Sequence, residues 1–211
     1  MLELVKVSGQ RKDFSLKQIS FKAENGFIYG IAGKNGAGKT TLFHYILGDE
    51  QGSGQILYDG KNITADRIDY MNCVGFVSDE NHFFMEMSSD KNGSMLGGFY
   101  REWDEASFKM WLKEFGVPGG VPLSGLSRGE YIKFQMAFAM AHKASLFLLD
   151  EATAGMDPVF RKDFFRILRG IASEDKVILM STHIQDELER KVDYVGIMDN
   201  GSFGGFRENV S

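Results

Sequence analysis

Short apolar runs separated by turn-forming residues make up the first third of the chain. This spacing is typical of β-strands, and the turns between the runs are rich in Gly, Asn and Asp. A helix is expected over residues 38–47, at the end of a glycine-rich segment. The predicted strands cover residues 2–7, 17–23, 27–32, 55–58 and 73–77.

The middle of the chain has the spacing of helices instead. Two helices are predicted, over residues 104–115 and 128–143, and the second is rich in Ala and Met. The first carries four apolar residues at helical spacing, which we expect to lie in a core: Phe108, Trp111, Leu112 and Phe115.

Strand-like runs return in the last third, over residues 146–149, 177–181 and 194–198. They are apolar without alternation, as expected when helices cover both faces of a parallel sheet. The strand–helix–strand order predicts an α/β fold. Residues 85–125 are expected to form a helical insertion beside the sheet.

Composition narrows the class of protein. A chain of 211 residues is long enough for one sizeable core and short for two full domains. Hydrophobic residues make up 43% and charged residues 25%, which is ordinary for a globular protein. The formal net charge of -5 argues against nucleic acid as a partner.

Targeting signals and cysteine usage point to the cytoplasm. No apolar stretch approaches the ~20 residues that a bilayer-spanning helix needs. The first residues lack the basic start and apolar stretch of a signal peptide. The single cysteine, Cys73, cannot form an internal disulfide, and we expect it to be a small buried residue on a strand.

The strongest chemical signal is a phosphate-binding loop at residues 33–40, which matches G-x-x-x-x-G-K-[ST] without a mismatch. Glycines let backbone N–H groups approach phosphates closely, and the following helix presents its N-terminus to the same anion. Lys39 is expected to bridge the β- and γ-phosphates of ATP, and the Thr40 hydroxyl to bind Mg²⁺. The residues expected to bind the nucleotide here are Gly33, Asn35, Gly36, Ala37, Gly38, Lys39, Thr40 and Thr41.

Two carboxylates end the apolar run at residues 146–149. Asp150 is expected to hold Mg²⁺ through water. Glu151 stands where a base could orient and deprotonate the attacking water. Two acids often merely end a buried strand, so this signal gains its weight from the phosphate-binding loop.

Three further motifs complete a known pattern. They are Leu126-Ser127-Arg128-Gly129-Glu130, Ala154-Gly155-Met156-Asp157 and Ser181-Thr182-His183. These segments look like the signature, D-loop and H-loop of ABC ATPases, and all five motifs follow in the order of that family. The chain therefore resembles an ABC transporter ATP-binding subunit over essentially its whole length.

The resemblance implies a single domain over residues 1–211. Its core would comprise residues 1–82 and 144–211, a mixed sheet with flanking helices and an N-terminal antiparallel β subdomain. About residues 83–143 would form a helical subdomain that carries the signature.

The resemblance also implies a composite site. Two cassettes would pack head to tail with ATP between them, as a homodimer or a heterodimer. Ser127 and Gly129 of one subunit would contact the γ-phosphate held by the other, and His183 would help position the water. The remaining histidines lack such a setting and are expected to be surface or packing residues: His44, His82 and His142.

Several positions depart from the family pattern. Arg128 stands where Gly is commoner, and Glu130 replaces Gln. Asp79 occupies the position of the Q-loop glutamine, where a carboxylate could bind Mg²⁺ through water but cannot donate as an amide does. The aromatic that usually stacks on adenine is missing. Arg11 could stack on the base through its guanidinium plane, with Phe14 as an alternative that is expected to pack inward.

Within the family, residues 99–104, the Asp at the Q-loop position and the Ser-Arg-Gly signature look like ABC-2-type exporters of bacteria. The resemblance then implies a multi-spanning membrane permease as partner, with the chain peripheral on the inner face of the membrane. Residues 83–87 would either receive a coupling helix of that permease or form the core of the helical subdomain. A soluble ABC-type ATPase, such as an iron–sulfur assembly protein, is the alternative.

Overall fold

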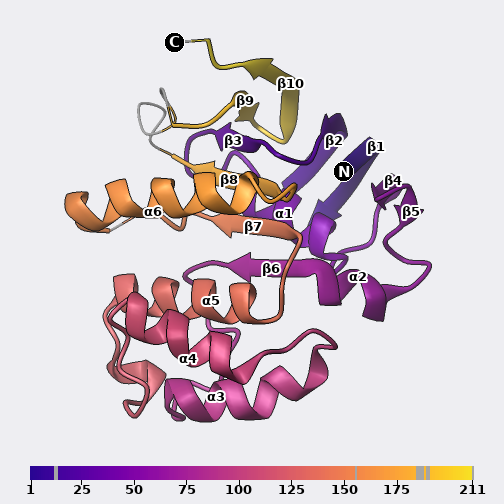
Figure 1. The fold of residues 1–211 in the computed structure, drawn as a ribbon. Coiled ribbons are helices and arrows are strands. Elements are labelled where there is room, and N and C mark those ends of the chain that lie inside the picture. Colours follow the sequence, from indigo (N-terminus) through magenta and orange to yellow (C-terminus); the bar gives the residue numbers. More distant parts are fainter. Residues whose placement is uncertain (12–13, 155, 184–187, 189–190, 211) are drawn as a thin grey trace.

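The computed structural model of the chain describes residues 1–211 apart from 12–13, 155, 184–187, 189–190 and 211. Two sheets and a set of helices make up the described part (Figure 1). Among the described residues, no helix is long and apolar enough to cross a membrane.

The larger sheet has six strands in the order β10-β9-β3-β8-β7-β6. All neighbouring pairs run parallel except β9 and β10 at one edge. Its strands are β3 (Ile28–Ala32), β6 (Val74–Val77), β7 (Leu146–Asp150), β8 (Val177–Thr182), β9 (Tyr194–Asp199) and β10 (Ser202–Glu208).

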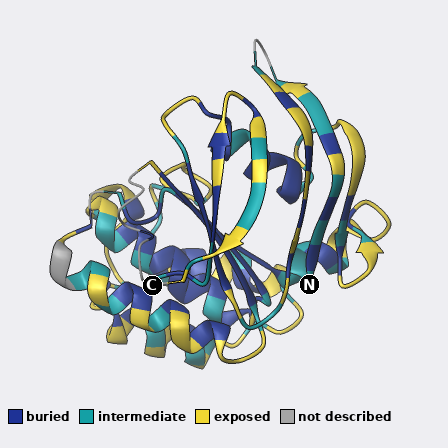
Figure 2. Cartoon of the chain, turned by 90° about the horizontal axis from the view of Figure 1, so that it is seen from above, coloured by how far each residue is buried: buried dark blue, intermediate teal, exposed yellow. Residues whose placement is uncertain are grey.

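Strand β7 shows why the central strands are apolar without alternation. All five of its residues are buried, and its four apolar residues alternate between two cores. Phe147 and Leu149 lie in the core with helices α5 (Arg128–Ala141) and α6 (Pro158–Ala172). Leu146 and Leu148 lie in the other core with helix α1 (Lys39–Leu47). Figure 2 shows these buried strands between the exposed outer segments.

The smaller sheet is antiparallel, with four strands in the order β2-β1-β4-β5. Leu4 and Ile19 of this sheet share a core with Leu42 and Phe43 of α1, so α1 lies between the two sheets. Burial from both sides explains why most of α1 is buried. The strands are β1 (Leu2–Arg11), β2 (Phe14–Ala23), β4 (Ser53–Tyr58) and β5 (Lys61–Asn62).

A layer of helices below the larger sheet is formed by α3 (Ser89–Leu96), α4 (Glu105–Glu114) and α5, with short 3₁₀ turns at Gly97–Phe99 and Leu123–Gly125. The predicted apolar face of α4 is confirmed, because Phe108, Leu112 and Phe115 are buried. Trp111, the fourth predicted core residue, is half-buried against the same core.

The segment before β6 corrects one prediction. Residues 67–73 form a helix, α2 (Arg67–Cys73), capped by the Asp66 side chain, which accepts a hydrogen bond from the Asp69 N–H. Cys73 therefore ends a helix instead of lying on a strand, and it is half-buried. Burial raises the pKa of its thiol above the usual value. Strand β6 begins one residue later, at Val74.

Candidate nucleotide-binding and hydrolysis site

The loop between β3 and α1 has the backbone that a phosphate cradle requires. Gly36 and Gly38 have φ of 80° and 106°, in the left-handed region that favours glycine. A side chain at Gly38 would also collide with the ring of Phe14, which packs against the loop. Lys39 then begins α1, so the N-terminus of that helix faces the same loop.

The Lys39 ammonium lies inside the loop, with only 5% of the residue exposed. Its Nζ donates hydrogen bonds to the carbonyl oxygens of Gly33 at 2.7 Å and Lys34 at 3.2 Å. It also forms an ion pair with Glu151, whose Oε1 lies 3.0 Å away. The loop thus concentrates a buried positive charge where an anion would bind.

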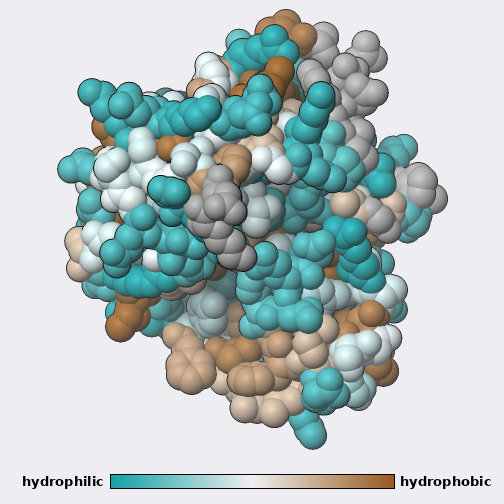
Figure 3. All heavy atoms as spheres, turned by 180° about the vertical axis from the view of Figure 1, so that it is seen from behind, coloured by the Kyte–Doolittle hydropathy of each residue, from teal (hydrophilic) through white to brown (hydrophobic). Residues whose placement is uncertain are grey.

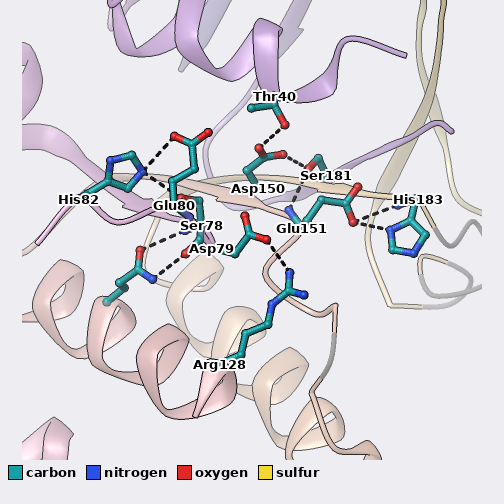
Figure 4. Close-up of polar contacts among 11 residues, drawn as sticks. Thr40, Ser78, Asp79, Glu80, His82, Arg128, Asp150, Glu151, Ser181 and His183 are labelled. Carbon is teal, nitrogen blue, oxygen red and sulfur yellow. Dashed lines mark hydrogen bonds and ion pairs between the residues drawn. The ribbon is translucent and has the colours of Figure 1, made fainter. Parts of the chain in front are cut away.

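Asp150 joins three elements. Its Oδ2 accepts a hydrogen bond from Thr40 Oγ1 of α1 at 2.6 Å, and its Oδ1 accepts one from the Ser181 hydroxyl of β8 (Figure 4). The parallel register of β7 and β8 sets Asp150 beside Ser181. Burial raises the pKa of Asp150, and the hydroxyl donors offset part of this effect.

The donor set suits Mg²⁺ bound together with a nucleotide. Among the described residues, no group of three or more His, Cys, Asp or Glu side chains could hold a metal ion alone. Mg²⁺ usually keeps waters and phosphate oxygens as ligands and takes only one or two from protein. The Thr40 hydroxyl would supply one such ligand, and the Asp150 carboxylate, which Thr40 Oγ1 contacts at 2.6 Å, would hold one of the waters.

Glu151 is held in an unusual backbone conformation. Its φ is 51°, in the left-handed region, and its N–H donates to Ser181 Oγ at 3.0 Å. This conformation turns the carboxylate toward His183, whose ring Nδ1 lies 2.7 Å from Glu151 Oε2 (Figure 4). The backbone N–H of His183 donates to the same oxygen at 3.3 Å.

The charge state of Glu151 follows from these contacts. Burial would raise the pKa of Glu151, but His183 and Lys39 outweigh burial, so the pKa is lowered from its usual value. Glu151 is therefore ionised at neutral pH and able to accept a proton. Because an ionised carboxylate only accepts hydrogen bonds, Nδ1 of His183 is the donor.

The raised pKa of Asp150 indicates that its ionised carboxylate destabilises the folded chain at neutral pH. For a carboxyl group whose folded-state pKa is raised, stability is present below the unfolded pKa and is lost as pH rises through the folded pKa. Asp150→Asn removes the buried charge, and the Asn side chain can still bond both hydroxyls. We expect its Tm at pH 7.5 to rise by about 2–4 °C. Thermal unfolding without nucleotide measures this, and a Tm gain that persists at pH 3 would contradict it.

The signature residues lie at the start of α5. Ser127 caps this helix and forms a capping box with Glu130, whose Oε2 accepts from the Ser127 N–H at 2.8 Å. The hydrogen bonds from Ser127 lower the pKa of Glu130. Glutamate at this position thus has a local reason, because it completes the cap. Ser127 is exposed and Gly129 is half-buried, so this end of the helix is accessible.

Two predicted site residues have partners of their own. Asp79 Oδ2 lies 3.1 Å from Arg128 Nη2, so a Q-loop position is paired with a signature position (Figure 4). Arg11 Nε lies 2.9 Å from Glu50 Oε1 at the end of β1. The Mg²⁺ role of Asp79 and the base-stacking role of Arg11 stay predictions. Gly155 of the D-loop lies outside the described residues.

Sequence reasoning missed one residue of the site. In the sequence, Ser181 stands out only as part of the H-loop motif, yet its hydroxyl donates to Asp150 and accepts the backbone N–H of Glu151. A hydroxyl residue at the end of an apolar strand was the available signal. The pairing of β8 with β7 gives it meaning, and that pairing joins residues 31 positions apart.

The fold and the site together define a P-loop nucleotide-binding domain. The family profile of the ABC transporters matches residues 16–154. The chain belongs to the ABC transporter family, as one of its ATP-binding domains.

Two named proteins are similar in sequence to this chain over most of its length. It is 29% identical over 206 residues to the bacitracin transport ATP-binding protein BcrA of Bacillus licheniformis, covering 94% of this chain and 66% of the relative. It is 31% identical to a Nod factor export ATP-binding protein I of Neorhizobium galegae, covering 87% and 54%. The chain thus spans between 54% and 66% of the length of these two relatives.

Solved structures share the fold. An ATP-binding subunit of an ABC transporter superposes with a TM-score of 0.88 at 23% identity, covering 99% of this chain and 90% of that one. A dimeric ATP-binding cassette bound to ADP and Pi superposes with a TM-score of 0.86 at 18% identity, covering 100% of each chain. At these identities the likeness establishes the fold alone.

Proposed function

We propose that the chain binds Mg-ATP at the loop of residues 33–40 and hydrolyses it. The observation that carries this proposal is that Glu151 contacts both Lys39 and His183. Lys39 Nζ lies 3.0 Å from Oε1 of Glu151, and His183 Nδ1 lies 2.7 Å from its Oε2. A phosphate-binding cation, an ionised carboxylate and an imidazole then meet at one edge of the sheet. This set suits transfer of a phosphoryl group to water.

Each residue has a role that its contacts support. Lys39 binds the β- and γ-phosphates, which take over from the carbonyl oxygens that it now contacts. Glu151 accepts a proton from the attacking water because its carboxylate is ionised. His183 holds that carboxylate in place through the Nδ1 contact. Thr40 directly and Asp150 through water would hold Mg²⁺, which would supply positive charge to the phosphates.

We propose further that two cassettes enclose the nucleotides, with Ser127 and Gly129 of each subunit contacting the γ-phosphate held by the other. The accessible N-terminus of α5 supports this, because its N–H groups and helix dipole favour an anion. Measuring the mass of the purified chain in solution with Mg-ATP tests whether the second cassette is a copy of this chain.

Ser127→Arg tests this arrangement. The added bulk and lost cap should abolish ATP-driven dimerisation, while the affinity of the single chain for ATP stays within about 2-fold because the phosphate-binding loop is untouched. Light scattering and equilibrium binding with a fluorescent ATP analogue give the two values. Ser127→Ala, which loses the cap without adding bulk, is the control. Normal dimerisation of Ser127→Arg would show that α5 does not face the partner's phosphate.

We also propose that ATP turnover drives transport through a separate multi-spanning membrane subunit. Transport would run in the export direction, and the chain would bind that subunit on the inner face of the membrane. The named relatives support it, one being a bacitracin transport protein and another a Nod factor export protein. An apolar groove of about 720 Å³ between α2, the helical layer and β6 offers a docking surface. Ile68 and Phe99 on its walls are 70% and 79% exposed. Figure 3 shows apolar side chains gathered over the lower, helical part of the molecule.

Co-purification from membranes tests the transport role. We expect a tagged chain, extracted from its native host in mild detergent, to recover a multi-spanning membrane protein. A matched variant, Ile68→Glu with Phe99→Glu, should lose that partner and keep ATP binding, because the groove lies apart from the phosphate-binding loop. Recovery with soluble assembly factors instead would replace transport by the soluble ATPase alternative.

A further inference from the structure

One face of α5 is polar and meets the segment of residues 78–82 that follows β6. Its residues Arg128, Tyr131 and Gln135 are spaced at i, i+3 and i+7, which places them along one side of the helix. Each of the three contacts a different residue of the segment.

Gln135 makes the innermost contact and is buried, with 1% exposed. Its Oε1 accepts the N–H of Ser78 at 3.1 Å, and its Nε2 donates to the Ser78 carbonyl at 2.7 Å. One side-chain amide thus satisfies both backbone groups at the point where β6 ends.

Tyr131 repeats this pattern one turn closer to the start of α5. Its hydroxyl donates to the Glu80 carbonyl at 3.1 Å and accepts the N–H of His82 at 3.4 Å. Burial raises the pKa of Tyr131. Two side chains of α5 therefore make four hydrogen bonds with the backbone of the segment.

Arg128 makes the outermost contact, through the ion pair with Asp79 at 3.1 Å (Figure 4). Both side chains are exposed, so water screens the pair and it adds little to the stability of the fold. The pair is important because it lies at the start of α5, next to Ser127. Arg128 is the first residue of α5 and follows Ser127, and both paired residues line a cleft of about 320 Å³.

The segment also reaches the nucleotide site. Val77, the residue before it, pairs with Leu149, the neighbour of Asp150 on β7. Glu80 Oε2 lies 3.7 Å from Nε2 of His44 on α1, the helix that begins at Lys39. A continuous set of contacts therefore runs from α1 and β7, through residues 78–82, to the start of α5.

We propose that Arg128 and Asp79 are positioning residues that, with Tyr131 and Gln135, lock residues 78–82 to α5. The lock holds the first turn of α5, and Ser127 that caps it, in the position from which Ser127 would face the other cassette. This inference rests on the proposed function. It gives a shared reason for two of the departures from the family pattern, Arg128 in the signature and Asp79 at the Q-loop position.

Swapping the two charges tests the lock. The variants are Asp79→Arg, Arg128→Asp and the double variant that carries both substitutions. In nucleotide-free protein, we expect each single variant to speed amide hydrogen exchange of residues 78–82 by about 3–10-fold, and the double variant to restore it within about 2-fold. In ATP hydrolysis, kcat should fall about 5–10-fold in the singles with KM for ATP within about 2-fold, and recover in the double. Because both side chains are exposed, we expect the substitutions to leave the fold intact.

Controls separate the lock from general effects. Swapping the charges of the exposed pair Lys143 and Glu102, beyond the other end of α5, should leave both the amide hydrogen exchange and the hydrolysis rate unchanged. Gln135→Leu, which removes both bonds to Ser78, should speed exchange at Ser78 whatever its effect on hydrolysis.

A double variant no better than Asp79→Arg would overturn the proposal, because Asp79 would then act by direct contact with the nucleotide or Mg²⁺. Unchanged hydrogen exchange in both singles would overturn it as well, because no lock would exist. A wild-type chain that binds ATP but never hydrolyses it would remove the proposed function instead, and the exchange measurement would still decide on the lock.

Discussion

Glu151→Gln should bind ATP and almost stop hydrolysing it. Glutamine keeps the size of the side chain and can still meet His183, but it cannot accept the proton of the attacking water. General-base catalysis contributes about 10²–10⁴-fold, so the single-turnover rate should fall by that factor. The affinity for ATP should stay the same or increase, because Lys39 loses the competing carboxylate at 3.0 Å.

Rapid-quench measurement of the single-turnover rate, with equilibrium binding alongside, gives both values for Glu151→Gln. Glu174→Gln is a matched control, because the exposed Glu174 forms an ion pair with Lys176, away from the phosphate-binding loop. A Glu151→Gln rate within about 3-fold of wild type would contradict its assignment as the base.

Lys39→Ala should lose nucleotide binding. A hydrogen bond to a charged group is worth about 1.5–3 kcal/mol, so losing the phosphate contacts of the ammonium should raise the Kd for ATP by at least about 10–100-fold. The affinity for adenosine, which has no phosphate, should barely change. The pKa of Glu151 should also rise, because one of the groups that lower it is gone.

Lys34→Ala is the matched control for Lys39→Ala. It removes the same charge from the same loop, but the Lys34 side chain is exposed and only its carbonyl contacts Lys39. Isothermal titration with ATP and with adenosine compares the two variants. Equal ATP affinities in Lys39→Ala and wild type would contradict the phosphate-binding role of the loop.

Local patterns account for what could be predicted from the sequence. The phosphate-binding loop is one contiguous motif, and two of its glycines, Gly36 and Gly38, have a positive φ. Asp150 and Glu151 follow an apolar run that is indeed a buried strand. The central strands were recognisable because burial on both faces makes them uniformly apolar.

What could not be predicted depends on contacts between distant residues or on short elements. The pair Asp79 and Arg128 joins positions 49 apart, and no local pattern announces it. Helix α2 has seven residues, too few for a clear periodicity, so Cys73 was placed on a strand. Helix α6 was also missing from the predicted elements, although Phe164, Leu168 and Ile171 recur at helical spacing and are buried.

The most direct test of the account is the mass in solution of Glu151→Gln with and without Mg-ATP, measured by sedimentation velocity. This variant should hold ATP without turning it over, so an ATP-dependent assembly should accumulate. The account predicts a monomer without nucleotide and a dimer with Mg-ATP, and a monomer again when Ser127→Arg is added. A protein that is saturated with Mg-ATP and remains a monomer would contradict the composite site between two copies of this chain.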